Sequence, residues 1–261
     1  MQLLQIDAFT DRPYCGNPAA VCILEHPADE GWMQCVAAEK NLSETAFLHP
    51  EADGYRLRWF TPKVEVELCG HATLASAHAL WELDLADPND ILYFYTRSGR
   101  LSAQRDREWI ELDFPASPVV QIEPPSQLLE ALGVRPQFVG ENVLKDLLVE
   151  VATEDEVRQL QPDFAKLTKL SARGVIVTSS SNSEYDFVSR FFAPAAGIDE
   201  DPVTGSAHCA LAPYWGRKLG KMELTGFQAS RRGGIVRVRR DGERVVLGGR
   251  AVTVLRGQLL V

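Results

Sequence analysis

Hydrophobic and polar positions alternate over many short runs of this 261-residue chain, and a period of two is typical of strands. A first hairpin is predicted from the alternating segment LLQIDAF, the turn-rich stretch DRPYCGNP and the apolar segment AAVCIL. A helical stripe covers residues 29–40, and further strand patterns are LSETAFL, YRLRWF, ILYFYT, WIELDF, GVIVTS, IVRVRR and RVVLGG. The pattern predicts many short strands with helices between them.

Two stretches of the chain match each other without gaps. Residues 58–81 read RWFTPKVEVELCGHATLASAHALW, and residues 190–213 read RFFAPAAGIDEDPVTGSAHCALAP. Both contain an arginine, a phenylalanine and a proline at the same spacing, at Arg58, Phe60 and Pro62 and at Arg190, Phe192 and Pro194. The match indicates an internal repeat, and chance similarity between two Ala-rich segments is the alternative. We expect each half to contain an aromatic strand, a Pro-marked loop, an acidic stretch and a helix.

The two helices of this repeat, from about Gly70 and from about Pro202, carry small and apolar residues around their whole circumference. Such helices are enclosed by other structure, so the strands are expected to curl around each helix as an incomplete barrel. The predicted fold class is α+β with two similar barrel-like halves, residues 1–116 and 117–261. The last strand could return to the first half.

Composition and charge narrow the function classes. The chain is 45% hydrophobic and 24% charged, with 36 acidic and 27 basic residues and a net charge of −9, so nucleic acids and anionic membranes are unfavourable partners. The basic cluster RRGGIVRVRR alternates with apolar residues and is interpreted as the solvated face of a strand. No apolar run approaches the roughly 18 residues of a membrane span, and the N-terminus does not resemble a leader, so a cytoplasmic protein is expected.

The cysteines do not form a metal-binding pattern. There are five, which are widely spaced and lack the short paired spacings of zinc sites, at Cys15, Cys22, Cys35, Cys69 and Cys209. Reduced thiols and no structural metal are therefore predicted.

The starts of the two repeated helices are candidate anion sites, because unpaired N–H groups and the positive end of the helix dipole favour negative charge. Gly70 and His71 open the first helix, and DPVTGSA, with Asp201, Gly205 and Ser206, opens the second. Asp201 also has a structural interpretation, since Asp at the N-cap and Pro at the first helical position form a favoured helix start. His71 suits either a hydrogen-bonded core histidine or a polar group of the site.

Glu44 breaks the pattern of its strand. In LSETAFL it shares a face with Leu42, Ala46 and Leu48, so its carboxyl group is expected to point inward. Burial disfavours the charged form of a carboxyl group, which suits a group that both takes and gives a proton near neutral pH. An inward glutamate paired with an arginine is the alternative.

Together, the motifs DAFTDRPYCGNPAAV, NLSETAFL, RWFTPKVEVELCGHATLASAHAL and APAAGIDEDPVTGSAHCALAPYW resemble the PhzF-like phenazine-biosynthesis family over nearly the whole chain. The resemblance implies a diaminopimelate epimerase-like fold of two halves with the active site between them. In the phenazine enzyme, a glutamate of the Ser-Glu pair shifts a proton across dihydro-3-hydroxyanthranilate without metal or organic cofactor. That residue corresponds to Glu44.

The resemblance also assigns further roles by position in the motifs. The implied catalytic residues are Glu44, Asp201 and His71, and the implied substrate-binding residues are Ser43, Gly70, Gly205, Ser206 and Asn17. A turn role for Asn17 is the alternative. The implied partners are a small carboxylated substrate and a second copy of the chain in a homodimer.

One position departs from the pattern of diaminopimelate epimerase, which carries a catalytic cysteine at each helix mouth. The ungapped repeat pairs Cys69 with Asp201, so only one thiol is present. Three hypotheses follow. The first is an isomerase that moves a proton through Glu44. The second is a non-catalytic small-ligand or protein-interaction member of the same fold, and the third is an epimerase assisted by Cys69.

Overall fold

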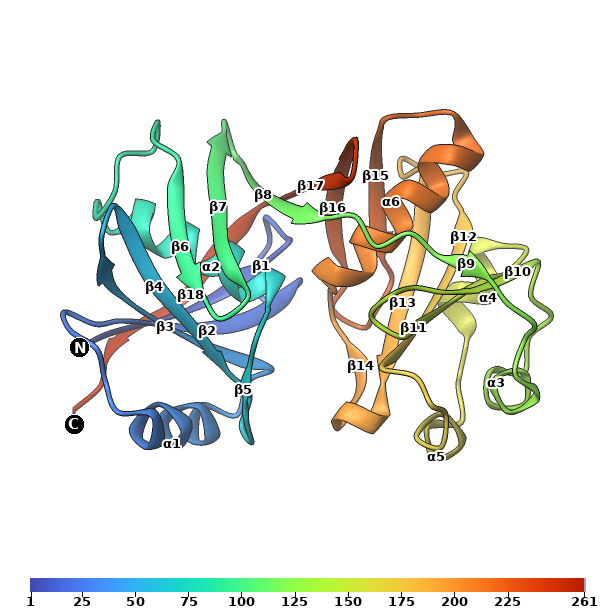
Figure 1. Ribbon diagram of the computed structural model, residues 1–261, viewed down its shortest axis with the longest axis horizontal. Coiled ribbons are helices and arrows are strands. Elements are labelled where there is room, and N and C mark those ends of the chain that lie inside the picture. Colours follow the sequence, from blue (N-terminus) through green and yellow to red (C-terminus); the bar gives the residue numbers. More distant parts are fainter. Residues whose placement is uncertain (261) are drawn as a thin grey trace. The chain divides into compact units, whose positions relative to one another are not determined.

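A computed structural model describes residues 1–260, and the chain forms two compact units. Unit 1 comprises Met1–Asp113 and the chain from Gly248 onward, and unit 2 comprises Phe114–Leu247 (Figure 1). The end of the first predicted half thus lies close to the border between the units, and the last strand belongs to unit 1. No helix among the described residues is long and apolar enough to cross a membrane.

Among the residues that the structure describes, unit 1 contains eleven strands and helices, of which only β8 extends past its border. They are β1 (Gln2–Ala8), β2 (Asn17–Ile23), α1 (Glu30–Lys40), β3 (Glu44–Glu51), β4 (Gly54–Phe60), β5 (Glu65–Val66), α2 (Gly70–Glu82), β6 (Leu92–Thr96), β7 (Gly99–Asp106), β8 (Trp109–Pro115) and β18 (Ala251–Gln258). The predicted helix over residues 29–40 is α1, with Asp29 as its N-cap and Asn41, in the left-handed region, as its C-cap.

Unit 2 repeats this sequence of elements with extra helices on its strand connections. They are β9 (Val120–Gln121), α3 (Ser126–Leu132), β10 (Phe138–Glu141), β11 (Asp146–Glu150), α4 (Glu154–Gln159), α5 (Phe164–Leu167), β12 (Gly174–Ser180), β13 (Phe187–Ala193), η1 (Pro194–Ala196), β14 (Ile198–Asp201), α6 (Gly205–Leu219), β15 (Glu223–Gln228), β16 (Gly234–Asp241) and β17 (Arg244–Gly249).

Strand pairing is the same in both units. In unit 1, β1 is antiparallel to β18 and β2, β2 is parallel to β3, β3 is antiparallel to β4, and β4 is parallel to β6. In unit 2, β10 is antiparallel to β9 and β11, β11 is parallel to β12, β12 is antiparallel to β13, and β13 is parallel to β15. The predicted α+β fold of two similar halves is confirmed.

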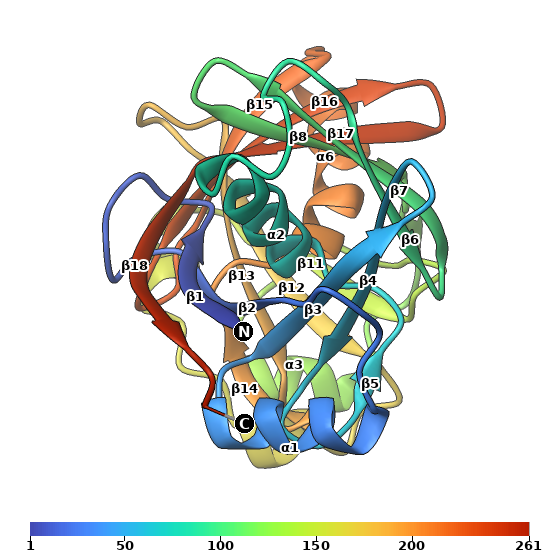
Figure 2. The same cartoon turned by 90° about the vertical axis from the view of Figure 1, so that its left-hand side faces the viewer.

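Each unit encloses one long helix, as expected from the sequence. Ten of the thirteen residues of α2 are buried, and the helix packs against β1, β2, β3 and β18 (Figure 2). Nine of the fifteen residues of α6 are buried, and it packs against β15 and β16. Small residues on all sides of α2 let these strands approach it closely, so a polar group at the helix start lies at the edge of a dry core.

The repeat contains an insertion that the ungapped match does not show. Arg58 holds Glu65 of β5 through Nε and Nη2, seven residues along the chain, whereas Arg190 holds Glu200 of β14 in the same way, ten residues along. Unit 2 therefore has three more residues in this loop, where η1 forms. With this shift, Cys69 is equivalent to Thr204, not to Asp201.

The shift also corrects the predicted start of the second helix. Asp201 pairs with Phe191 in the sheet, so β14 continues through Asp201 and α6 begins only at Gly205. The N-cap of α6 is Thr204, which makes no side-chain capping bond. The interpretation of Asp201 as an N-cap followed by Pro202 at the first helical position is therefore wrong. The predicted start of the first helix at Gly70 is correct.

Candidate active site

Glu44 opens β3, whose following residues from Thr45 to Leu48 are buried on both faces of the sheet. Phe47 packs toward α1, while Glu44, Ala46 and Leu48 point to the opposite face by the alternation of the strand. The Glu44 side chain is only 14% exposed. The predicted inward carboxyl group is therefore present in the structure.

His71, the second residue of α2, is the partner of Glu44. Its Nε2 lies 3.2 Å from Glu44 Oε2, and its side chain is 6% exposed. Burial lowers the pKa of His71 to about 3, so the imidazole is neutral at neutral pH. Because the ring is neutral, this contact brings no positive charge to the Glu44 carboxylate. The alternative of an inward glutamate paired with an arginine stays a prediction.

Cys69, the N-cap residue of α2, lies on the other side of the ring. Its Sγ is 3.5 Å from His71 Nδ1, and the residue is 7% exposed. A neutral imidazole has one N–H donor and one acceptor. If Nδ1 accepts from the thiol, the N–H is at Nε2, the atom that lies 3.2 Å from Glu44 Oε2. The structure thus brings three sequence-predicted residues into one chain of contacts.

The same three residues form a donor set that suits a metal ion. One thiol, one imidazole and one carboxylate atom, from Cys69, His71 and Glu44, lie within 4.8 Å of one another. Zn²⁺ accepts such ligands, with three from the protein and a fourth position open in catalytic sites. The expectation of a site without metal or organic cofactor stays a prediction.

The other predicted residues of unit 1 lie beside this group or beneath it. Ser43 directly precedes β3 and is partly exposed, and Gly70 is the first residue of α2. Asn17, the first residue of β2, is completely buried. Its predicted substrate-binding role and the alternative role in a turn both stay predictions.

In unit 2, Asp201 is tied to the start of α6. Its Oδ2 accepts a hydrogen bond from Thr204 Oγ1 at 2.5 Å, and its backbone carbonyl accepts from Gln228 Nε2 at 2.8 Å. Gln228 Oε1 also accepts from the Thr204 backbone N–H. Buried Gln228 therefore fixes the loop between β14 and α6. The predicted acid–base role of Asp201 stays a prediction.

Ser206 has a partner that the sequence reasoning missed. Arg173 Nη2 donates to Ser206 Oγ at 3.0 Å and to Asp146 Oδ2 at 2.5 Å. Gly205 lies beside Ser206 as the first residue of α6 and is buried. Arg173 comes just before β12 and Ser43 just before β3, so the repeat itself, continued into these strands, was the signal that could have identified it.

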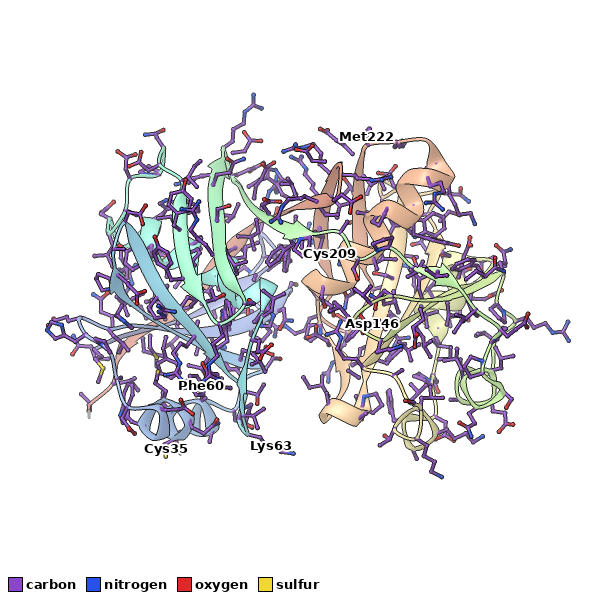
Figure 3. The ribbon with its side chains drawn as sticks, viewed as in Figure 1. Cys35, Phe60, Lys63, Asp146, Cys209 and Met222 are labelled. Atoms are coloured by element: carbon purple, nitrogen blue, oxygen red, sulfur yellow. The ribbon has the colours of Figure 1, made fainter. Side chains whose placement is uncertain are left out.

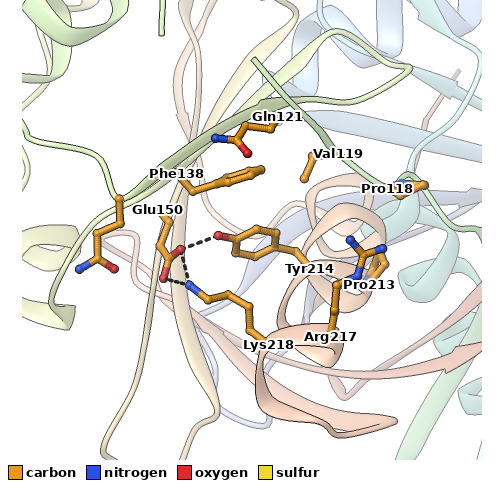
Figure 4. Close-up of a pocket in the computed structure, with 10 residues that line it drawn as sticks. Pro118, Val119, Gln121, Phe138, Glu150, Pro213, Tyr214, Arg217 and Lys218 are labelled. Atoms are coloured by element: carbon orange, nitrogen blue, oxygen red, sulfur yellow. Dashed lines mark hydrogen bonds and ion pairs between the residues drawn. The ribbon is translucent and has the colours of Figure 1, made fainter. Parts of the chain in front are cut away.

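A separate cavity lies in unit 2 and contains none of the predicted site residues. Its volume is about 650 Å³. At its wall, Glu150 accepts hydrogen bonds from Tyr214 Oη and Lys218 Nζ, and these contacts satisfy the buried carboxylate (Figure 4). The cavity is lined by Pro118, Val119, Gln121, Gln137, Phe138, Glu150, Pro213, Tyr214, Arg217 and Lys218.

Comparison with known proteins shows the family to which this chain belongs. A model of the family described as "Phenazine biosynthesis-like protein" matches residues 6–257. The chain belongs to the phenazine biosynthesis-like family. A relative from Halalkalibacterium halodurans, named as an isomerase, is 55% identical over 98% of this chain and 97% of its own length. A Pseudomonas aeruginosa relative, also named as an isomerase, is 50% identical over 99% of this chain and 98% of its own length.

Solved structures show the same fold. A PhzF-family phenazine biosynthesis protein from Enterococcus faecalis has a TM-score of 0.96 and 41% identity, covering 100% of this chain and 99% of that one. A probable proline racemase from Agrobacterium radiobacter has a TM-score of 0.66 at 14% identity, covering 100% and 93%. The second likeness concerns the fold alone. The resemblance of the sequence motifs to the family, and the diaminopimelate epimerase-like fold that it implied, are confirmed.

Proposed function

We propose that this protein is a cofactor-independent isomerase that moves a proton within a small carboxylated substrate, with Glu44 as the acid–base group. The observation that carries the proposal is the contact between the inward carboxylate of Glu44 and the neutral ring of His71. Membership of a family whose relatives are named as isomerases supports the reaction class. The expected homodimer and cytoplasmic location stay predictions.

The geometry suits a carboxylate that takes and returns one proton. His71 Nε2 lies beside Glu44 Oε2, and because the ring is neutral it stabilises the carboxylate less than an imidazolium would. The carboxylate removes a proton from one carbon of the substrate, and the resulting carboxylic acid delivers it to another. The electron pair left by the first C–H bond is taken up as the second C–H bond forms, so no oxidant or reductant is needed.

Isotope exchange tests the proposal. The protein is incubated in deuterated water with dihydro-3-hydroxyanthranilate, the substrate that the family resemblance implies, and with other small ring carboxylates, and deuterium at carbon is followed by NMR. We expect exchange in the wild type and its loss in Glu44→Gln. Glu51→Gln, the same change at the other end of β3, is the matched control and should retain exchange. Unchanged exchange in Glu44→Gln would overturn the role of Glu44.

A thiol-assisted epimerase is the second candidate, favoured by the 3.5 Å contact between Cys69 Sγ and His71 Nδ1. His71 could accept the thiol proton there and leave a thiolate as the base. This candidate predicts that iodoacetamide abolishes exchange in the wild type and that Cys69→Ser is inactive. Full activity of Cys69→Ser would exclude it. A non-catalytic binding protein predicts ligand binding without exchange, with equal affinity in the wild type and Glu44→Gln.

A further inference from the structure

The second residue of each enclosed helix contacts a side chain of opposite charge in the two units, from positions one residue apart in the repeat. In unit 1, the second residue of α2, His71, contacts Glu44 at the start of β3. In unit 2, the second residue of α6, Ser206, contacts Arg173 just before β12. The helix and strand that meet are the same in both units, but an acidic side chain is used in one and a basic side chain in the other.

The position of Arg173 is electrostatically unusual for a helix start. The first turn of α6 is the positive end of the helix dipole, where anions are favoured and cations are not. Arg173 is nevertheless held there by Asp146, whose side chain is completely buried within unit 2 (Figure 3). Asn142 Nδ2 donates to the same Asp146 oxygen at 3.2 Å, which further fixes the carboxylate.

The Arg173 guanidinium keeps hydrogen-bonding capacity after these contacts. Only Nη2 donates in the part of the chain that the structure describes, to Asp146 and to Ser206, although a guanidinium has five N–H donors. The side chain is 42% exposed, so a ligand can reach it from solvent. A guanidinium of this kind matches the two oxygens of a carboxylate in a bidentate arrangement.

We infer that Arg173 binds the carboxylate group of a small organic anion at the first turn of α6. Asp146 and Ser206 position the guanidinium, and the helix dipole adds to the attraction for negative charge. The inference rests on residues of unit 2 and holds whether or not Glu44 transfers a proton. The alternative is that Arg173 only neutralises buried Asp146.

The test compares anthranilate with anthranilamide, which has a neutral amide in place of the carboxylate, by calorimetric titration. Arg173→Gln alone would leave the buried Asp146 charge without its partner, which is strongly destabilising. The full-length variants are therefore Asp146→Asn, which keeps Arg173, and the double variant Asp146→Asn with Arg173→Gln. Both lack the buried charge, and the amide carbonyl introduced by Asp146→Asn can still accept from Arg173. Urea unfolding verifies that both are folded.

We expect the wild type and Asp146→Asn to bind anthranilate roughly tenfold or more tightly than anthranilamide, as for a charge-assisted hydrogen bond. The double variant should bind both compounds with similar, weak affinity. A preference for anthranilate that is as large in the double variant as in Asp146→Asn would overturn the inference. Absence of any preference in the wild type would overturn it as well.

Discussion

Gly174 in unit 2 occupies the position that Glu44 occupies in unit 1. Thr45 is paired with Phe60 across β3 and β4, and Val175 is paired with Phe192 across β12 and β13. The residue before each of these pairs is Glu44 in one unit and Gly174 in the other. The duplicated fold thus carries a carboxyl group at this strand position in one copy only. Packing shows why a side chain is absent from the second position.

Replacement of Gly174 by alanine should destabilise the protein. A Cβ atom at this position would lie 2.2 Å from a ring carbon of Phe191, which is buried, so the ring or the strand has to move. Overpacking of this kind costs about 1–3 kcal/mol of unfolding free energy. Urea unfolding of Gly174→Ala measures the loss. In a Phe191→Leu background the same change should cost less, and equal costs in both backgrounds would contradict the proposed clash.

His71→Gln should reduce exchange by misplacing the Glu44 carboxylate. If His71 only positions Glu44, kcat should fall by up to about 100-fold while KM changes little, because a small misplacement of a reacting group is enough for such a loss. Since burial lowers the pKa of His71 to about 3, the shape of the kcat profile between pH 5 and 8 should be the same in the variant. Disappearance of a limb of the profile in this range would show that His71 itself titrates during the reaction.

The fold was predictable from the sequence because two kinds of pattern agreed. The repeated Arg–Phe–Pro spacing defined the aromatic strand in each half, and the small residues around Gly70 and Gly205 indicated two enclosed helices. Glu44 could be singled out because a strand alternates strictly, so a carboxyl group on the apolar face is conspicuous. The contact between Glu44 and His71 could not be derived, since it depends on how β3 packs against α2.

The wrong helix start and the missed arginine both lie where contacts between distant segments, rather than the local sequence, determine the structure. Asp-Pro is typical of a helix start, but Asp201 continues β14 because Phe191 pairs with it, and three additional residues around η1 displace the repeat. Arg173 was missed because it lies outside the alternating segment, and its role depends on Asp146 of another strand. Such contacts between distant segments form only when the chain is folded.

Asp201→Asn separates a chemical role of Asp201 from a structural one. The amide oxygen can still accept the hydrogen bond from Thr204 Oγ1, so we expect the unfolding free energy to change by less than about 1 kcal/mol. If Asp201 is a second acid–base group, exchange should fall by roughly 10²–10⁴-fold. Thr204→Val is the matched control, because it removes the hydroxyl donor and retains the carboxylate. Full exchange in Asp201→Asn would leave Asp201 with a structural role only.

The stability of the protein should fall as the solution is acidified below about pH 6.5, the usual pKa of histidine. Burial lowers the pKa of His71 to about 3 and that of His208 to about 4, so both are neutral in the folded protein while the unfolded chain takes up protons. The unfolded state then binds more protons, and each group costs up to about 1.4 kcal/mol per pH unit. The loss should begin near pH 6.5 and level off, for each group, below its folded pKa.

His208→Thr tests whether His208 contributes to this pH dependence of stability. The replacement is the residue found at the equivalent position of unit 1. Thr73, the equivalent residue of α2, donates to the Cys69 carbonyl at 2.6 Å, as His208 Nδ1 contacts the Thr204 carbonyl at 2.8 Å. Threonine can thus supply the hydrogen bond without titrating. The smaller side chain should lower stability at every pH, while the dependence of unfolding free energy on pH between about 4 and 6.5 becomes shallower. Urea unfolding across this range gives the slope, and an unchanged slope would show that His208 is not among the groups that take up protons.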